Sequence, residues 1–178
     1  IHTQATIYPL DTLYCNFEWS ANKISKEDAR FKLGLDPHKF IIFSSSRLVA
    51  EKQLDKMLMS LNEIKDMDIQ VIISGTGELK YENYLKNLTE KMNLTSKVLF
   101  VGFLQENLLD YYCASDLFIS TSRSEAGPVS AIKAMALRIP VISTDTGIAA
   151  YLLKEYNAGL ILDEKDNKYW GRKIKKVI

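Results

Sequence analysis

Short runs of apolar residues alternate along the chain with segments in which apolar residues recur every three or four positions. A continuous short apolar run is typical of a strand buried on both faces, whereas the three-to-four spacing is typical of a helix with one buried face. The predicted strands are 40–43, 69–73, 98–101, 117–119, 141–142 and 160–162. The predicted helices begin with one that Ser25 caps and Gly34 ends, and continue at 54–61, 81–92, 105–114, 129–137 and 168–177.

Strand and helix alternate at least five times in this pattern. Parallel strands need a crossover connection, which a helix supplies, so the alternation predicts an α/β fold with a doubly wound parallel sheet. Ligands of such sheets bind beyond the carboxyl ends of the strands. Three predicted loops lie there, at 44–52, 74–78 and 120–128. We therefore expect these loops to converge on a binding site.

Composition says little about the fold, but it argues against some classes of function. The chain has 178 residues, 25% of them charged, and a net charge of +1. This balance gives no reason to expect a nucleic-acid partner, which usually meets a basic face. Neither His2 nor His38 has a carboxylate or cysteine at ligand spacing, so we expect no metal site. The two cysteines, Cys15 and Cys113, fit idle thiols in a reducing, cytoplasmic compartment.

The start of the chain predicts its domain organisation. Ile1 stands where an initiator Met would be expected, and the first residues have no clear period. We therefore expect a piece of a longer protein, with a linker or edge segment at 1–24 and one Rossmann-like domain at 25–178. No apolar run reaches the roughly 18 residues that span a bilayer.

The loop after the first predicted strand carries two cations, Arg47 and Lys52. The guanidinium fork of arginine matches phosphate oxygens, and lysine supplies a point charge for the same anion. Basic loop residues are also commonly solvated surface, and this interpretation stays open. At the carboxyl end of a strand we favour phosphate binding.

The segment 116–144 compresses a strand, a polar loop, a helix and a second strand into one unit. Pro128 suits the first helical position, because proline lacks an amide hydrogen. The amides of Val129 and Ser130 would then be free at a positive helix end, where phosphate binds well. Glu125 stands just before that end, and accepts sugar hydroxyls or simply favours the helix terminus by its charge.

Two further features have a plain structural alternative. The glycines of Gly75-Thr76-Gly77 permit close approach of a ligand, or they make a tight turn. The predicted helix 129–137 is apolar almost all round except for Lys133, which either faces a cleft or snorkels to solvent.

In combination and in order, these segments resemble a known family. Segment 44–52 resembles the G-R-L-x-x-x-K-G motif, 75–77 the G-x-G turn and 98–102 the V-x-F-x-G strand of retaining glycosyltransferases with the GT-B fold, often called family 4 or glycosyl transferases group 1. Segment 122–144 resembles their S-x-x-E-G-x-P-x-x-x-x-E-A-M-A-x-G-x-P-V-I-x-T segment. The resemblance covers about 40–162, and it matches the carboxyl-terminal half of such enzymes.

The resemblance implies a sugar transfer from a nucleotide-diphosphate sugar, of UDP or GDP type, in polysaccharide or glycolipid biosynthesis, with no separate cofactor. It assigns Arg47 and Lys52 to the donor diphosphate and its departure, and Glu125 to hydroxyls of the transferred sugar. The residues that it places at the nucleotide sugar are Gly75, Gly77, Phe103, Gly127, Pro128, Val129, Ser130 and Lys133. The acceptor glycan or glycolipid would bind an amino-terminal half. Contact with the inner face of the membrane is left open by the basic tail, 172–176.

Two departures from the family pattern bear on this assignment. The family has an acidic residue eight positions after Glu125, at the nucleotide ribose, and this chain has Lys133. An ammonium group only donates hydrogen bonds, so it does not replace a carboxylate there. The donor is then held differently, a cation has taken over part of the phosphate binding, or the donor site is degenerate. The usual glycine before Pro140 is also replaced, by Arg138-Ile139.

A different class of function therefore stays open, namely a non-catalytic GT-B-like binding module with a degenerate donor site. A receiver-like signalling domain is disfavoured, because it needs clustered acidic residues at strand ends, where this chain has Arg47 and Gly75.

Overall fold

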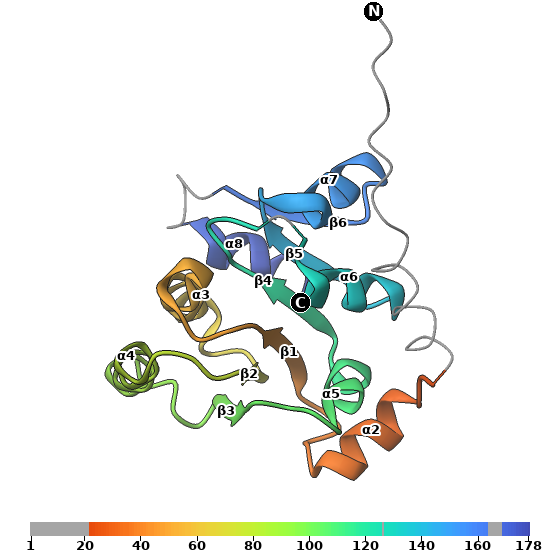
Figure 1. The fold of residues 1–178 in the computed structure, drawn as a ribbon. Helices are drawn as coiled ribbons and strands as arrows, with labels where there is room; N and C mark the ends of the chain where they lie inside the picture. The colour runs from red at the N-terminus through yellow and green to blue at the C-terminus, as the bar shows by residue number, and fades with distance from the viewer. Residues whose placement is uncertain (1–21, 126, 164–168) are drawn as a thin grey trace, which may run out of the picture.

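The fold is an α/β arrangement around one six-stranded parallel sheet (Figure 1). A computed structural model describes residues 22–125, 127–163 and 169–178. The strands are β1 (Phe40–Ser45), β2 (Ile69–Ser74), β3 (Val98–Gly102), β4 (Leu117–Ser120), β5 (Val141–Thr144) and β6 (Gly159–Leu162). Their order in the sheet is β3-β2-β1-β4-β5-β6, and every pairing is parallel. The predicted doubly wound, Rossmann-like fold is confirmed.

The strand order reverses between β1 and β4, which lie side by side in the middle of the sheet. Ile42 pairs with Leu117 and Phe43 with Phe118 across this junction. The connections from β1 run toward one edge of the sheet and those from β4 toward the other. A crevice therefore opens at the carboxyl ends of these two strands, where doubly wound folds bind their ligands.

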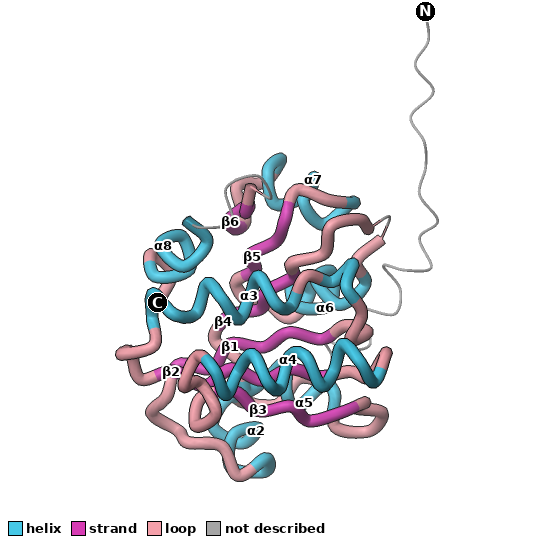
Figure 2. The backbone as a smooth tube through the Cα atoms, turned by 90° about the vertical axis from the view of Figure 1, so that its left-hand side faces the viewer, coloured by secondary structure: helices cyan, strands magenta, loops and turns pink. Residues whose placement is uncertain are grey.

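Helices cover both faces of the sheet (Figures 1 and 2). One face is covered by α3 (Leu54–Leu61), α4 (Leu79–Lys91) and α8 (Trp170–Lys175). The other is covered by α2 (Lys26–Leu33), α5 (Leu108–Ala114), α6 (Val129–Ala136) and α7 (Gly147–Glu155). Short 3₁₀ turns at Ala50–Lys52 and Asn62–Ile64 flank α3.

Alternation along β1 supplies both hydrophobic cores. Ile42 packs with the α3 side of the sheet, whereas Ile41 and Phe43 pack with the α5 side. The Phe43 ring meets the Tyr112 ring edge-on, with centroids 5.0 Å apart. Because side chains of a strand alternate between its faces, an apolar run like this one needs cover on both.

The predicted N-terminal cap and C-terminal end of α2 are confirmed. The Ser25 side chain accepts a hydrogen bond from the Asp28 amide at 3.0 Å, and Gly34 ends the helix in a left-handed conformation. Arg30 then fixes α2 to the sheet, because its guanidinium contacts the Asp116 carboxylate at 2.5 Å. The same carboxylate accepts the Ile41 amide at 2.7 Å.

Two predicted helices are shorter in the structure, and one helix of the structure was not predicted. The helix predicted at 105–114 begins only at Leu108, and α8 spans Trp170–Lys175, with residue 168 outside the described residues. Helix α7 was not predicted, because Gly147 at its start suggests a loop and its residues are as apolar as those of the neighbouring strands. The linker predicted at 1–24 falls largely outside the described residues. Among the described helices, none is long and apolar enough to cross a membrane.

Candidate functional site

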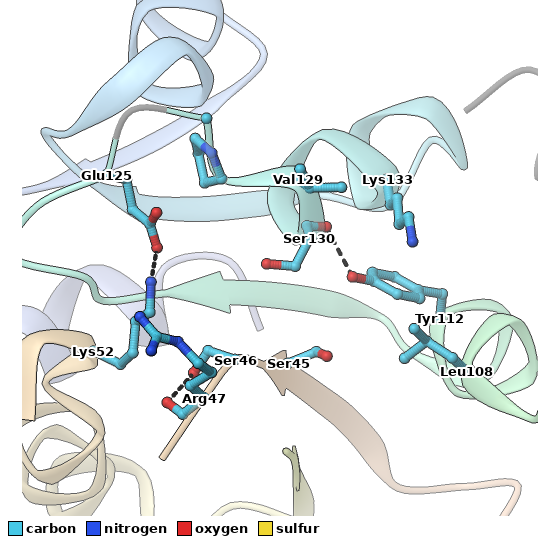
Figure 3. Close-up of a pocket in the computed structure, with 12 residues that line it drawn as sticks. Ser45, Ser46, Arg47, Lys52, Leu108, Tyr112, Glu125, Val129, Ser130 and Lys133 are labelled. Carbon is cyan, nitrogen blue, oxygen red and sulfur yellow. Dashed lines mark hydrogen bonds and ion pairs between the residues drawn. The ribbon is translucent and has the colours of Figure 1, made fainter. Parts of the chain in front are cut away.

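A cavity of about 320 Å³ opens at the carboxyl ends of β1 and β4 (Figure 3). This volume falls in the range of small-molecule sites, about 300–1,000 Å³. It lies at the reversal of the strand order, between the loop after β1 and the first turn of α6. The residues that line it are Ser45, Ser46, Arg47, Lys52, Leu108, Tyr112, Glu125, Gly127, Pro128, Val129, Ser130 and Lys133.

The loop after β1 is fastened to the loop after β2 by main-chain hydrogen bonds. The Ser46 amide donates to the Ser74 carbonyl at 3.1 Å, and the Leu48 amide to the Thr76 carbonyl at 3.0 Å. This contact requires glycine at Gly75, where a Cβ would lie 1.8 Å from the Ser46 carbonyl oxygen and φ is +130°. The loop that carries Arg47 and Lys52 is thus shaped by backbone contacts.

Gly77 has the same packing role. A Cβ there would lie 2.1 Å from the Leu48 carbonyl oxygen, and Gly77 does not line the cavity. The close-packed-turn interpretation of both glycines therefore has direct geometric support. Gly75 also lines a second cavity, described below.

Lys52 and Glu125 face each other across the cavity and form an ion pair (Figure 3). Their side chains are 13% and 19% exposed. The Thr121 hydroxyl donates to the Lys52 carbonyl at 2.8 Å, and the Ser122 hydroxyl donates to Glu125 Oε1 at 2.9 Å. Lys52 also contacts Oε1, which leaves Oε2 for other donors.

The amino terminus of α6 differs from its prediction. Helix α6 begins at Val129, and Pro128 is its N-cap residue. The Val129 amide donates to the Gly127 carbonyl at 2.8 Å, so it is not free for an anion as predicted. A three-residue turn thus satisfies one of the helix-terminal amides that the sequence left open.

Ser130 is held from the opposite side of the cavity. The Tyr112 hydroxyl donates to the Ser130 carbonyl at 2.9 Å, which joins α5 to the first turn of α6. Tyr112 is fully buried, and this burial raises the pKa of its phenol above the ordinary value. The Tyr112 hydroxyl therefore stays protonated and serves as a fixed donor.

Lys133 lines the same cavity as Arg47 and Lys52. Its neighbours in α6, Ala131, Ile132 and Ala134, are buried against the sheet. The structure therefore places Lys133 on the cleft side, which was one of its two predicted positions. Figure 3 shows its side chain at the end of the cavity that Tyr112 and Leu108 line.

A second cavity of about 370 Å³ adjoins the first. The residues that line both are Ser45, Ser46, Arg47 and Leu108. The residues that line only the second are Ser74, Gly75, Thr76, Phe103 and Leu104. Phe103 lines this second cavity and is 71% exposed. Together the two cavities form one elongated cleft along the carboxyl edge of the sheet.

The structure thus brings together ten of the eleven predicted site residues, with Gly77 outside either cavity. Ser45, Ser46, Ser74 and Thr76 belong to the loops that were expected to converge on a site, but no role was assigned to them. Leu104, Leu108 and Tyr112 were not identified as site residues. Tyr112 is both a core residue and a wall of the site. Leu108 lies inside the predicted helix 105–114, and nothing in its residue type distinguishes it from a core position.

Within the described residues, no three His, Cys, Asp or Glu side chains cluster as metal ligands do. Cys113 is a buried free thiol, and burial raises its pKa, so it is a poor nucleophile. Cys15 lies outside the described residues.

The chain is similar in sequence to known glycosyltransferases. The chain is 33% identical over 150 residues to a lipopolysaccharide core biosynthesis mannosyltransferase of Rhizobium meliloti, covering 80% of this chain and 42% of that protein. A glycogen synthase of Fusobacterium nucleatum is 31% identical over 138 residues, covering 76% of this chain and 30% of its own length. The chain therefore spans less than half of these relatives.

Solved structures show the same fold. A glycosyltransferase involved in lipopolysaccharide biosynthesis, WaaG, superposes with a TM-score of 0.80 at 18% identity, over 89% of this chain and 43% of that one. The Anabaena protein HepE, in complex with UDP and glucose, gives 0.75 at 21% identity, over 85% and 41%. Residues 25–178 match the sequence model of a family described as glycosyl transferases group 1. The chain belongs to this family.

Proposed function

We propose that this chain forms the donor-binding half of a retaining glycosyltransferase, which moves a hexose from a nucleotide-diphosphate sugar to a glycan or glycolipid acceptor. One observation carries the proposal. Arg47, Lys52 and Glu125, which come from loops far apart in the sequence, line one cavity at the reversal of the strand order.

The diphosphate would bind between Arg47 and Lys52. Arg47 is exposed at the junction of the two cavities, whereas the Lys52 ammonium is largely buried in the first. A buried ammonium interacts with an anion more strongly than an exposed one, because water screens it less. Lys52 would therefore supply more of the binding free energy, and Arg47 would orient the phosphate chain through its planar fork.

The transferred sugar would lie beside Glu125. The hydrogen bonds that the described residues make to this carboxylate fall on Oε1, which leaves Oε2 to accept sugar hydroxyls. The Ser122 hydroxyl holds the carboxylate in place. Such a preset acceptor orients the sugar without a rearrangement when the donor arrives.

The nucleoside would extend into the second cavity. Its wall combines the exposed Phe103 ring and the apolar Leu104 with the glycine-shaped loop at Gly75. A flat aromatic base fits a wall of this kind, since stacking on an aromatic ring needs no specific polar partner.

Catalysis in this arrangement is electrostatic. As the bond between sugar and phosphate breaks, negative charge grows on the departing diphosphate. Arg47 and Lys52 would lie beside that position before the bond breaks, so they would stabilise the transition state more than the bound donor. The acceptor and its base or nucleophile would come from the part of the protein that the relatives have and this chain does not span.

The names of the relatives support the biosynthetic setting. They include a mannosyltransferase of lipopolysaccharide core biosynthesis and a teichuronic acid biosynthesis glycosyltransferase of Bacillus subtilis. An Anabaena structure in complex with UDP-glucose shares the fold. We therefore include UDP among the nucleotides to be tested.

The experiment is a calorimetric titration of the 178-residue chain with UDP, GDP and ADP. We expect saturable binding of one nucleotide, and Lys52→Ala should weaken it. The control is Lys86→Ala, which should leave the affinity unchanged, because Lys86 is an exposed residue of α4 that lines neither cavity. If no nucleotide binds to the folded chain, donor binding is refuted and a non-catalytic module becomes the better interpretation.

A further inference from the structure

We propose that Thr144, which lines neither cavity, is a positioning residue for the donor sugar and acts through Ser122 and Glu125. The proposal rests on the proposed function, since it concerns the carboxylate that would accept the sugar hydroxyls. Its starting point is a chain of two hydrogen bonds that leads from the end of β5 to this carboxylate. The Thr144 hydroxyl donates to the Ser122 carbonyl at 2.5 Å, and the Ser122 hydroxyl donates to Glu125 Oε1 at 2.9 Å.

The bond from Thr144 lies just beyond the end of the main-chain pairing between β4 and β5. The register of these two strands runs only as far as Ser120, which pairs with Ser143. The chain after β4 then leaves the sheet, and the Thr144 side chain bonds to it where the ladder has ended. Thr144 and Ser122 are 1% and 3% exposed, so water competes little for this bond.

The same loop is bonded on its other side to the turn that carries Lys52. The Thr121 hydroxyl donates to the Lys52 carbonyl at 2.8 Å, and the Arg123 amide donates to the Glu51 carbonyl at 2.7 Å. Residues on either side of Ser122 are therefore tied toward β1, whereas Ser122 itself is tied toward β5. The loop that leads to the sugar-binding carboxylate is held between two neighbouring parts of the sheet.

Thr146 is a weaker donor to the same carbonyl. Its hydroxyl lies 3.5 Å from the Ser122 carbonyl oxygen, at the outer limit of a hydrogen bond, and Thr146 is only half-buried. Thr144 therefore makes the stronger of these two contacts. Its replacement by valine, which has nearly the same shape, removes that contact without leaving a large cavity.

Loss of the Thr144 hydroxyl should affect the sugar and spare the diphosphate. Glu125 also contacts Lys52 through Oε1, and this ion pair does not depend on the main chain at Ser122. A loop that shifts at Ser122 would thus keep the ion pair but lose the fixed direction of Oε2, the oxygen proposed to accept sugar hydroxyls. Small displacements of an orienting group weaken the interactions that it makes.

The test compares each nucleoside diphosphate with its sugar form. The 178-residue chain is titrated with UDP and UDP-glucose, GDP and GDP-mannose, and ADP and ADP-glucose, and the sugar ratio is the dissociation constant of the diphosphate divided by that of the sugar form. For the nucleotide that binds, we expect Thr144→Val to lower the sugar ratio about tenfold and to change the diphosphate affinity by less than about threefold. Thr144→Ser keeps the hydroxyl and should restore the ratio to within about twofold of the parent.

A double variant tests whether Thr144 acts through Glu125. We expect Glu125→Gln to lower the sugar ratio as well, and the further substitution Thr144→Val to change it by less than about twofold, because the two residues belong to one chain of bonds. If the effects of the two substitutions on the ratio multiply, they are independent, and the proposal is overturned.

Thr89→Val is the matched control. Thr89 is a threonine of α4, 3% exposed, whose hydroxyl donates to the Leu85 carbonyl at 2.9 Å, and it lines neither cavity. This substitution removes the same atoms from a similar environment, so it should leave the sugar ratio within about twofold of the parent. An equal fall in both variants would mean that the ratio reports general loss of stability, and would overturn the proposal.

The failures of the two proposals are distinguishable. If Glu125→Gln lowers the sugar ratio but Thr144→Val does not, the donor site stands and Thr144 has no positioning role. If no nucleotide binds to the folded parent chain, both proposals fall together. Thr144→Ala also removes the hydroxyl but places no methyl group against the Ser122 carbonyl, so it replaces Thr144→Val if that variant folds poorly.

Discussion

Lys52 and Glu125 contact each other across the junction of the two halves of the sheet, one from the loop after β1 and the other from the loop after β4. Both side chains are mostly buried, at 13% and 19% exposure. The Thr121 hydroxyl donates to the main-chain carbonyl of Lys52, and the Ser122 hydroxyl donates to the Glu125 carboxylate. The pair therefore sets the width of the cleft before a ligand arrives, and its two members should respond differently to substitution.

Substitution of Glu125 should separate sugar binding from phosphate binding. In Glu125→Gln the carboxylate charge is lost, so Lys52 faces the phosphate without a competing partner. We expect the affinity for the free nucleoside diphosphate to hold or rise by up to about threefold, while any gain in affinity from the attached hexose disappears. Titration with UDP and UDP-glucose measures both, with exposed Glu51→Gln as the control. A tenfold loss for UDP itself would contradict this.

Removal of either cation proposed to bind phosphate, Lys52 or Arg47, should weaken the binding of a nucleoside diphosphate. We expect Lys52→Ala to lower the binding free energy by about 1.5–3 kcal/mol, the range for charged hydrogen bonds, and Arg47→Ala to fall at the lower end because Arg47 is exposed. Calorimetry at two salt concentrations measures the change. Unchanged affinity in both variants would remove phosphate binding from this loop.

Three glycine substitutions should rank by the space around each Cα. Gly75→Ala should lower the free energy of unfolding by about 2–4 kcal/mol, because the new Cβ would lie 1.8 Å from the Ser46 carbonyl at a φ of +130°. Gly34→Ala has open space but a φ of +63°, and should cost about 1 kcal/mol. Gly127→Ala has neither restriction and should cost under about 0.5 kcal/mol. Urea unfolding measures the change in the free energy of unfolding for each variant. Equal changes in the three variants would refute the packing role of Gly75.

Alkaline pH should destabilise the protein in a way that depends on Tyr112. Burial holds the pKa of this phenol above its ordinary value near 10, so the folded state keeps the proton that the unfolded state loses. The stability from this group is complete below pH about 10 and falls as pH rises further. We expect Tyr112→Phe to lower the free energy of unfolding by about 1 kcal/mol at neutral pH, because the hydrogen bond to Ser130 is lost. Between pH 9 and 11 the unfolding free energy of this variant should fall less steeply than that of the parent.

The curve of unfolding free energy against pH measures this effect. Tyr151→Phe is the matched control, since the Tyr151 side chain is 58% exposed on α7. Tyr81, whose pKa is also raised by burial and by its bond to Asp55, should account for part of the remaining slope. Parallel curves for the parent and Tyr112→Phe would contradict the prediction.

The 178-residue chain by itself should bind a nucleotide but transfer no sugar. It spans 42% of the mannosyltransferase to which it is similar, and the acceptor would bind outside that span. An assay for nucleoside diphosphate release from UDP-glucose, with and without glycan acceptors, measures turnover. Transfer at a rate above that of Lys52→Ala would show that the chain is sufficient.

Much of this fold could be predicted from short apolar runs, because a strand buried on both faces leaves a direct trace in the sequence. The α2 cap at Ser25 and its end at Gly34 could be predicted for a similar reason, since each depends on a side chain, or its absence, at one position. Helix α7 could not, since its residues from Ile148 to Leu153 are as apolar as the adjoining strands and Gly147 suggests a loop.

The residues of the site could be predicted, but the main-chain hydrogen bonds that position them could not. Arg47, Lys52 and Glu125 were identified from residue type and position after strands. The bonds that hold them, such as the Arg123 amide to the Glu51 carbonyl at 2.7 Å, join main-chain atoms that every residue has. The Val129 amide was predicted to be free, because its hydrogen bond to the Gly127 carbonyl also joins main-chain atoms and does not depend on the Val129 side chain.

The fastening of the loop after β1 to the loop after β2 has a consequence for how such a site changes over time. Ser46 and Leu48 take part in it through main-chain atoms, and Gly75 permits it because it has no side chain. Positions that face the cleft can therefore be exchanged one at a time while the loops keep their course. The same tolerance makes the cleft a practical starting point for redesigning which ligand it binds.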